Sequence, residues 1–522
     1  MLSDGKLLIA KGEAPVYLLP QMVNRHGLIA GATGTGKTIT LKVIAESLSD
    51  AGVPVFLADV KGDISGMCRP GEGGAKLQER LDNLNISDFS YKAFPTRFFD
   101  VFGAGGHPVR TTISEMGPVL LARLLDLTEV QAGVLSLVFR IADDKGLLLI
   151  DMKDLRAMLR FIGDSKGEYT TEYGNASRAS IGAIQRALLT LEDAGGSEFF
   201  GEPALDVDDW IKLSDDGRGF INILDCRRLF HEPLLYSTFM LWLLTELFER
   251  LPEVGDLDKP RIAFFFDEAH LLFTDAPRSL LTKLEQVVKL IRSKGVGVYF
   301  ITQNPSDLPD AVLAQLGNRV QHALRAYTPN EIKSVKAAAN SFRANPAFNT
   351  EEAILDLSTG EALISFLDEK GRPSVVERAT VLPPQSLMGV IDDERRKNEI
   401  EASGLYGKYD TETDRESAYE LLTGAAAAPG GAIMEQPAPA QPDEISDEEY
   451  NKLSRYEQIK LDKQRARARQ MEAEASPAPK EKKKGKTKAD KALGRVTSSA
   501  MSSIGRELGR RLSRGIFGLL KD

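Results

Sequence analysis

The sequence has 522 residues, of which 42% are hydrophobic and 27% are charged, with a formal net charge of −9. This composition is typical of a globular protein with a large buried core, and the length allows about three domains. No apolar stretch reaches the roughly 20 residues that a membrane-spanning helix needs, and the two cysteines, Cys68 and Cys226, exclude a disulfide framework.

The N-terminal third begins with an alternation of strand and helix patterns. The stretch "HGLIAGATGTGKTITLKVIAESLSDAG" predicts a buried strand, a glycine-rich loop, a helix and a turn, and "VPVFLADVKGD" predicts a second strand. From about residue 113 to 211, apolar residues recur at three- and four-residue spacing, which predicts a helical insertion.

Strand patterns resume after the insertion, in "GFINILDC", "RIAFFFDEAH", "GVGVYFITQN" and "NRVQHALRAYT". Strands that alternate with helices imply a mainly parallel sheet with ligands at the carboxyl ends of its strands. The later stretch "EALISFLDEKGRPSVVERATV" predicts a closing hairpin. The expected fold class is therefore α/β.

The predicted organisation follows changes in composition. We expect a core over 1–385 that contains the insertion, a helical extension over 386–423, an Ala/Pro/Gly linker over 424–445, a charged helix over 446–475, a Lys-rich low-complexity segment over 476–491 and a basic amphipathic helix over 492–522. The N-terminus has no basic segment followed by an apolar block, which predicts a cytoplasmic protein.

The glycine-rich loop "GATGTGKT" matches the pattern G-x-x-x-x-G-K-[ST] at every fixed position. Its glycines would allow backbone N–H groups to surround phosphates at the positive end of the following helix. Lys37 would place its charge on the terminal phosphates, and Thr38 would offer a hydroxyl to Mg²⁺. A tight turn without a ligand is the structural alternative. The predicted nucleotide-binding residues are Gly31, Ala32, Thr33, Gly34, Thr35, Gly36, Lys37, Thr38 and Ile39.

A continuous apolar run, "IAFFF", ends in the acid pair Asp267 and Glu268. Such a run is typical of a strand buried on both faces. Asp267 is expected to hold Mg²⁺ and Glu268 to polarise the attacking water, although a helix cap also uses such acids. Gln303 follows another predicted strand, where its amide could sense the γ-phosphate and the water, or cap the next turn.

These motifs in this order, with "ITQNP" and "GNRVQHALRAYTP", resemble the HerA-FtsK superfamily of ring-forming motor ATPases. Within it the chain is similar to the bacterial HerA-like group that lacks an N-terminal β-barrel. The resemblance covers roughly residues 10–385. It implies a RecA-like P-loop core, ATP rather than GTP, and a hexameric ring with nucleotide at subunit interfaces.

The resemblance also implies an arginine that stabilises the developing phosphoryl charge, for which Arg319 and Arg325 are the candidates; either could instead pair with an acid. It likewise implies an acid near the γ-phosphate, Asp59 or Asp63, where a turn or N-cap role is the alternative. We assign no chemistry to His270, because "DEAH" here lacks the tandem motor domains of the RNA helicases named for it. With about 25 residues before the first core strand, we expect no barrel of the kind through which archaeal relatives dock their nuclease partner.

The C-terminal tail differs in charge from the rest of the chain. Residues 450–522 hold 20 Lys and Arg against 8 Asp and Glu, whereas residues 1–449 hold 46 against 67. An acidic body restricts nucleic-acid contact to local clusters, a pore or the tail. The apolar stripe of the last predicted helix could dock on protein, and its arginines could bind an anionic membrane surface or nucleic acid.

The leading hypothesis is a Mg²⁺-dependent ATPase that assembles as a homo-oligomeric ring and translocates or unwinds DNA. The competing hypothesis is an ATP-gated switch or scaffold that acts on a protein partner without threading a polymer. A small-molecule kinase is a third reading, which the helical insertion makes less fitting.

Overall fold

The computed structural model describes residues 2–3, 5–165, 176–255, 257–273 and 278–427. The chain divides into two compact units, residues 1–435 and residues 436–522. The predicted charged helix, Lys-rich segment and basic helix, and nearly all of the predicted linker, lie outside the described residues.

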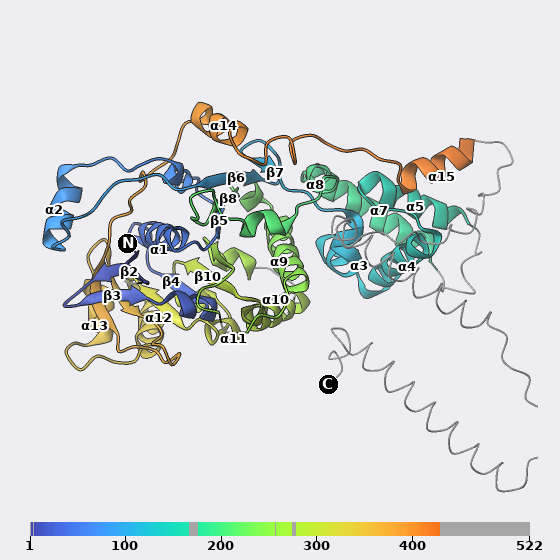
Figure 1. The fold of residues 1–522 in the computed structure, drawn as a ribbon. Helices are drawn as coiled ribbons and strands as arrows, with labels where there is room; N and C mark the ends of the chain where they lie inside the picture. The colour runs from blue at the N-terminus through green and yellow to red at the C-terminus, as the bar shows by residue number, and fades with distance from the viewer. Residues whose placement is uncertain (1, 4, 166–175, 256, 274–277, 428–522) are drawn as a thin grey trace, which may run out of the picture. The chain divides into compact units, whose positions relative to one another are not determined.

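A mixed sheet of 13 strands forms the centre of the described part of the chain (Figure 1). Its order is β1-β2-β13-β12-β11-β4-β10-β9-β5-β8-β6-β7, and β3 pairs with β2. The strands are β1 Leu2–Ser3, β2 Lys6–Lys11, β3 Pro15–Leu18, β4 Gly27–Ala30, β5 Val55–Asp59, β6 Thr96–Asp100, β7 His107–Pro108, β8 Ile221–Asp225, β9 Ile262–Phe266, β10 Val296–Thr302, β11 Asn318–Gln321, β12 Glu361–Ser365 and β13 Glu377–Val381.

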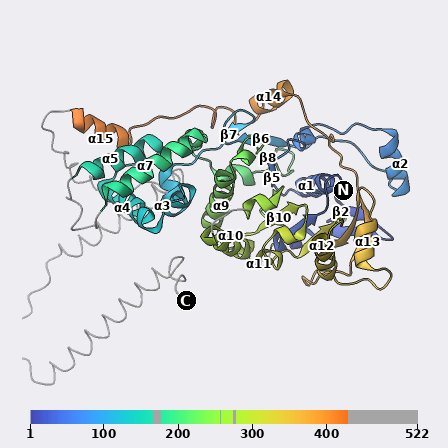
Figure 2. The ribbon, with the colours of Figure 1, turned by 180° about the vertical axis from the view of Figure 1, so that it is seen from behind.

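The helices connect these strands and cover both faces of the sheet (Figures 1 and 2). They are α1 Lys37–Asp50, α2 Ala75–Asn83, α3 Ile113–Leu124, α4 Glu129–Lys145, α5 Met152–Asp164, α7 Arg178–Asp193, α8 Gly196–Phe199, α9 Pro233–Arg250, α10 Arg278–Ile291, α11 Asp310–Leu313, α12 Pro329–Asn340, α13 Thr350–Asp356, α14 Asp393–Glu401 and α15 Ala418–Ala427, with short 3₁₀ turns η1 Pro20–Arg25, η2 Ser65–Cys68, η3 Val207–Ile211, η4 Leu229–His231, η5 Ala269–Leu272, η6 Arg292–Lys294 and η7 Pro305–Asp307.

The run from β11 to β6 is parallel, which confirms the predicted α/β class with a mainly parallel sheet. Strands β4, β5, β8, β9 and β10 are buried along their whole length. Alternate residues contribute to two separate cores: Phe265 packs on the α1 side, whereas Phe264 and Phe266 pack on the α9 side. Because both faces are covered, these strands are apolar throughout rather than alternating.

The described residues between 113 and 211 are mostly helical, and they pack against the sheet domain through α9. Helices α3 and α10 both contact α9, and its buried residues lie all around its axis. A helix that is apolar on every side must be buried on every side. Helix α4 begins with a capping box between Thr128 and Gln131, which satisfies free N–H groups at its N-terminus.

The predicted hairpin is present as the antiparallel pair β12 and β13. The sequence did not predict the N-terminal strands β1 to β3, which join the sheet because β2 pairs antiparallel with β13. After residue 385 the chain forms two separate helices, α14 and α15, rather than one extension, and α15 packs against α5 (Figure 1). Among the described residues no helix combines the length and apolar character needed to cross a bilayer.

Candidate nucleotide-binding and hydrolysis site

The glycine-rich loop lies between the end of β4 and the start of α1. Its backbone is fixed by neighbouring segments: Ala32 N–H donates to the Ala323 carbonyl at 2.8 Å, and Gly360 N–H donates to the Thr35 carbonyl at 2.9 Å. Gly34 and Gly36 have φ angles of 77° and 119°, which favour glycine. The loop is therefore shaped before any ligand binds.

His322, which the sequence analysis did not identify as a site residue, packs against this loop at Gly31. A Cβ atom on Gly31 would lie 2.5 Å from Cβ of His322, so the loop requires glycine there. The His322 ring nitrogens contact the Thr40 hydroxyl and the Glu361 carbonyl, each at 2.8 Å. Since a carbonyl only accepts, Nδ1 donates and Nε2 accepts. Burial lowers the pKa of His322 to about 4, so the ring is neutral at physiological pH.

Lys37 and Thr38 face the site from the first turn of α1. The Lys37 ammonium donates to the loop's own carbonyls, Gly31 O at 2.6 Å and Ala32 O at 3.1 Å. Burial, followed by the charge of nearby Lys61, lowers the pKa of Lys37. The Thr38 hydroxyl donates to Asp63 Oδ2 at 3.4 Å.

The acid pair follows β9 directly, at the same edge of the sheet as the loop, because β9 and β4 both run parallel to β10. Asp267 and Glu268 are only 4% and 6% exposed. Glu268 adopts a left-handed backbone with φ of 46°, and its N–H donates to Asp267 Oδ1 at 2.9 Å. Burial raises the pKa of Asp267 to about 6, because a desolvated carboxylate without a full counter-charge favours protonation.

The oxygen atoms of this corner fit a magnesium ion. Thr38 supplies a hydroxyl, and Asp63 and Asp267 supply carboxylates, which are the hard ligands that Mg²⁺ prefers. Among the described residues there is no cluster of three or more His, Cys, Asp or Glu side chains able to hold a metal by itself. Mg²⁺ usually binds through one or two carboxylates, water and substrate phosphates, so a sparse protein set is the expected arrangement.

The loop after β5 contributes a residue that the sequence analysis missed. Lys61 Nζ lies 2.7 Å from Glu268 Oε1 and 3.9 Å from Asp267 Oδ2. Burial alone would raise the pKa of Glu268, but the hydrogen bond and charge of Lys61 outweigh it and hold this pKa below its usual value. Lys61 stands between Asp59 and Asp63 in "LADVKGD", so its position beside two candidate acids was the available signal.

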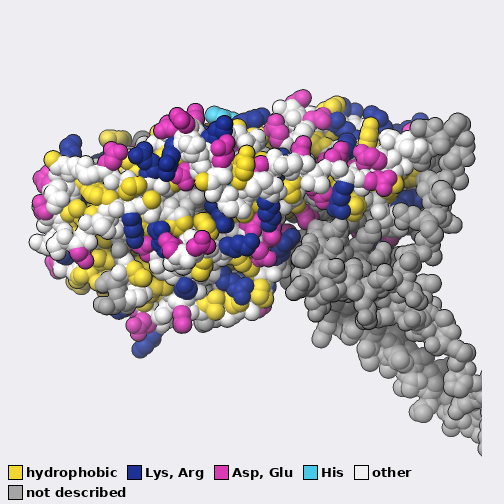
Figure 3. Space-filling model, turned by 45° about the horizontal axis from the view of Figure 1, so that its top comes forward, with side chains coloured by type: hydrophobic (Ala, Val, Ile, Leu, Met, Phe, Trp, Pro, Cys, Tyr) yellow, Lys and Arg dark blue, Asp and Glu magenta, His cyan; other side chains and the backbone are white. Residues whose placement is uncertain are grey.

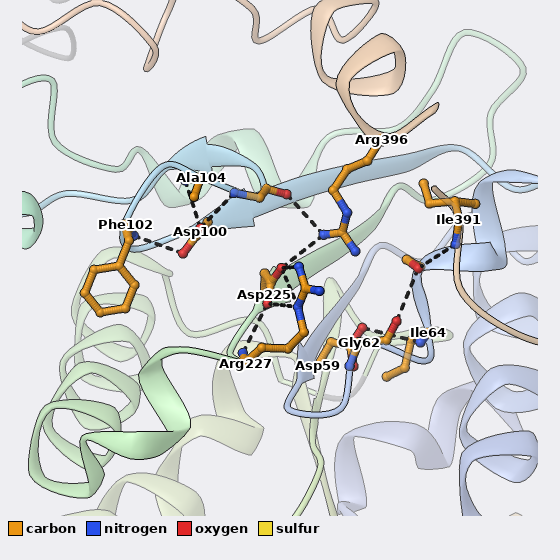
Figure 4. Close-up of polar contacts among 12 residues, drawn as sticks. Asp59, Gly62, Ile64, Asp100, Phe102, Ala104, Asp225, Arg227, Ile391 and Arg396 are labelled. Carbon is orange, nitrogen blue, oxygen red and sulfur yellow. Dashed lines mark hydrogen bonds and ion pairs between the residues drawn. The ribbon is translucent and has the colours of Figure 1, made fainter. Parts of the chain in front are cut away.

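The two candidate acids of this loop occupy different positions. Asp59 is 1% exposed, and its carboxylate accepts from the N–H groups of Gly62 at 2.7 Å and Ile64 at 3.3 Å (Figure 4). Asp59 therefore shapes the loop, whereas Asp63 reaches Thr38 at the site. His270, to which the sequence assigned no chemistry, also lies close, with Nδ1 3.4 Å from Glu268 Oε2.

Gln303 and Arg319 are placed differently relative to the loop. Gln303 is exposed and directly follows β10, whose Thr302 pairs with Ala30 of β4. Arg319 pairs with Leu28 instead, and its guanidinium donates to three carbonyls of its own chain, those of Leu313 and Leu316 at 3.1 Å and Ser341 at 3.4 Å. The structure does not bring Arg319 to the phosphate loop of the same chain.

The fold and this arrangement of loop lysine and acid pair define a RecA-like P-loop ATPase. The family model described as "Helicase HerA-like C-terminal" matches residues 5–522. The chain belongs to this family, as its motifs predicted.

Two relatives are described as "DNA double-strand break repair helicase HerA". The protein from Sulfolobus acidocaldarius is 23% identical over 368 residues, which cover 69% of this chain and 66% of the relative. The protein from Sulfurisphaera tokodaii is 21% identical over 373 residues, covering 69% of this chain and 67% of the relative. The chain thus spans about two thirds of the length of these relatives, and slightly less in the first case.

Solved structures also show some similarity. The plasmid coupling protein TrwB, solved with the GTP analogue GDPNP, has a TM-score of 0.49 and 16% identity, covering 75% of this chain and 94% of that protein. VirB4 of Thermoanaerobacter pseudethanolicus has a TM-score of 0.46 and 15% identity, covering 76% of this chain and 99% of that protein.

Proposed function

We propose that this protein is a Mg²⁺-dependent ATPase that assembles as a hexameric ring and uses hydrolysis to translocate along DNA or unwind it. The observation that carries the proposal is the convergence of Lys37, Thr38, Asp63, Asp267 and Glu268 at one edge of the sheet. The DNA substrate rests on the two relatives, which are named as DNA repair helicases.

The side chains of the site have distinct roles in this proposal. Lys37 exchanges its two loop carbonyls for oxygens of the terminal phosphates, which are stronger partners because they are charged. Thr38 and Asp267 hold Mg²⁺, which when bound supplies positive charge to the phosphates. Glu268 orients the attacking water and accepts its proton. The water oxygen then bonds to the γ-phosphorus, the bond to the bridging oxygen breaks, and ADP leaves with the electron pair.

A ring places nucleotide between subunits, where exposed residues of one subunit can reach the site of the next. Gln303 is exposed at the site edge and fits the predicted sensor role. Both candidate arginines donate to carbonyls of their own chain, Arg319 to three of them and Arg325 to that of Leu355 alone at 3.5 Å, and Arg325 is exposed beyond the end of β11. We therefore propose Arg325 as the better candidate for contact with a neighbouring subunit, in place of Arg319.

The acidic body favours a second candidate function, an ATP-gated switch or scaffold that acts on a protein partner. On the face of the molecule seen in Figure 3, the described residues present basic and acidic side chains interspersed, with no broad basic area. DNA contact would then depend on a pore or on the tail. Binding of a membrane surface or a protein through residues 492–522 stays a prediction, as does a cytoplasmic location, with which the two free, buried cysteines agree.

The experiment that separates these functions measures ATP hydrolysis and particle mass together, with and without duplex DNA, over a series of salt concentrations. A motor should form a ring, and DNA should stimulate its hydrolysis severalfold with an affinity that falls steeply as salt rises. Hydrolysis that no nucleic acid stimulates at low salt would favour the switch. Lys37→Ala should abolish nucleotide binding, and Glu268→Gln should bind ATP but hydrolyse it slowly. Hydrolysis by Glu268→Gln at the parent rate would refute the assigned base.

A further inference from the structure

Lys61 adds a second ammonium group to the site, close enough for its charge to act on Lys37. Lys61 contacts both acids that follow β9, at 2.7 Å and 3.9 Å, and its charge is the largest influence on the pKa of Lys37 after burial. Lys37 begins α1 and Lys61 follows β5, so two cations from different elements lie near the same acid pair. Without nucleotide, Asp267 and Glu268 offset the repulsion between the two cations. The terminal phosphate of a bound nucleotide would bring a further anion to the same region.

The backbone that carries Lys61 is fixed on both sides. Asp59 accepts from the N–H groups of Gly62 and Ile64, and the Ser65 hydroxyl donates to the Gly62 carbonyl at 3.3 Å while accepting from Ile391 N–H at 3.2 Å (Figure 4). The Lys61 side chain, in contrast, is 42% exposed. A fixed backbone with a long, half-exposed side chain allows the ammonium group to change partner without any rearrangement of the loop.

We propose that Lys61 is a further catalytic residue, which pairs with Glu268 in the nucleotide-free site and transfers to a γ-phosphate oxygen when ATP binds. The transfer releases Glu268 Oε1 to hold the attacking water. It also places a second positive charge, besides that of Lys37, where negative charge develops during hydrolysis. This proposal rests on the proposed function, because it needs Glu268 to be the group that orients the water.

Magnitudes distinguish this role from that of a structural ion pair. An exposed ion pair contributes about 1 kcal/mol or less to stability. Glu268 is buried, however, so Lys61→Met also leaves a carboxylate without its closest cation, whereas Lys61→Arg keeps a cation there. A preorganised donor at a developing oxyanion accelerates a reaction by roughly 100- to 1,000-fold. A large loss of kcat with little loss of stability or nucleotide affinity would therefore be the signature of the proposed role.

The test compares Lys61→Met, Lys61→Arg and a matched control, Lys397→Met, on the full-length protein. Lys397 lies on α14 with a side chain that is 75% exposed. We expect Lys61→Met to lower kcat for ATP about 100-fold and to change the Kd of a fluorescent non-hydrolysable ATP analogue less than about threefold. Lys61→Arg should have a kcat at least about tenfold higher than that of Lys61→Met. Lys397→Met should match the parent.

Three results would overturn the proposal: a kcat of Lys61→Met within about twofold of the parent, a kcat above the parent, or an equal loss of kcat and of analogue binding. The parent and Glu268→Gln show whether the underlying function holds. If the parent hydrolyses ATP and Glu268→Gln does not, the proposed function holds, and the kcat values of the Lys61 variants decide whether Lys61 is catalytic. If Glu268→Gln hydrolyses at the parent rate, the proposed base and the role of Lys61 both fail, and the Lys61 measurements are not needed to show it.

Discussion

Helix α14 docks on the sheet through one buried cation beside the partly buried Ile400, and removal of that cation gives a sharp prediction. Arg396 is the only residue of α14 that is buried. Its guanidinium donates to the Gly105 carbonyl at 3.1 Å and to Asp225 Oδ2 at 3.2 Å (Figure 4). It also lies 4.9 Å from the centre of the Phe98 ring. A nine-residue helix is not stable alone in water, so α14 should lose its helical structure when this anchor is lost.

The expected cost for Arg396→Met follows from these contacts. The charged hydrogen bonds contribute about 1.5–3 kcal/mol and the cation–π contact about 0.5–1 kcal/mol. Asp225 keeps Arg227 as a partner, so the cost of a fully unpaired buried charge does not apply. We therefore expect the free energy of opening α14 to fall by about 3 kcal/mol, which corresponds to roughly a 100-fold loss of amide protection.

Hydrogen exchange of the α14 amides, followed by mass spectrometry, measures this loss. The neighbouring substitution Arg395→Met is the control, because Arg395 is 46% exposed and pairs with Glu399 one turn away. That exposed pair should change protection by less than about threefold. Equal effects of the two substitutions, or unchanged α14 protection in Arg396→Met, would refute the reasoning that a single buried guanidinium anchors the helix.

Three further predictions concern the site itself. Gly31→Ala should abolish binding of a fluorescent ATP analogue while leaving the circular dichroism spectrum unchanged, because its Cβ would meet His322 at 2.5 Å and displace the loop; retained affinity would show that the loop adjusts. Asp63→Asn should raise the Mg²⁺ concentration for half-maximal hydrolysis about tenfold, since a carboxylate beside Thr38 is lost, whereas an unchanged magnesium titration would remove Asp63 from the metal site. Burial lowers the pKa of His322 from 6.5 to about 4, so the unfolded chain binds a proton there first, and the stability that the neutral ring contributes is lost as pH falls from 6.5 towards 4. Between pH 7.5 and pH 5, urea denaturation should show the parent losing about 2 kcal/mol more than His322→Asn, and parallel losses would contradict the assigned pKa.

Elements of the fold and residues of the site could be predicted where a single short segment of the sequence has a distinctive residue pattern. Strands β9 and β10 are buried on both faces and read as largely apolar runs, and the phosphate-loop pattern fixes Lys37 by itself. The N-terminal strands β1 to β3 are only partly buried and carry no comparable pattern, and β2 joins the sheet by pairing with β3 and β13. Pairing between segments so distant in sequence is decided by the tertiary fold.

The site residues likewise divide into those predicted by a local motif and those whose position depends on the tertiary fold. Lys37, Asp267 and Glu268 stand in local motifs, so their chemistry could be predicted without knowing the order of strands. Lys61 and His322 act through residues more than 200 positions away in the chain, Glu268 for the former and Thr40 for the latter. Their contribution follows from the placement of β5 beside β9 and of β11 beside β4, which no single segment encodes.

Residues at and just after the expected core boundary at 385 contact the helix that carries Lys37 and Thr38. Helix α1 carries two buried ionisable residues behind the phosphate loop, Lys42 at 1% and Glu46 at 0% exposure. Lys42 donates to the Leu387 carbonyl, and Glu46 accepts from the N–H groups of Gln385 and Ser386. Buried charges are tolerated only when they are paired and hydrogen-bonded. The segment from residue 385 therefore stabilises the helix that presents Lys37 and Thr38, and through Ile391 and Ser65 it also reaches the loop of Lys61. Movement of this segment would change both sides of the nucleotide site together.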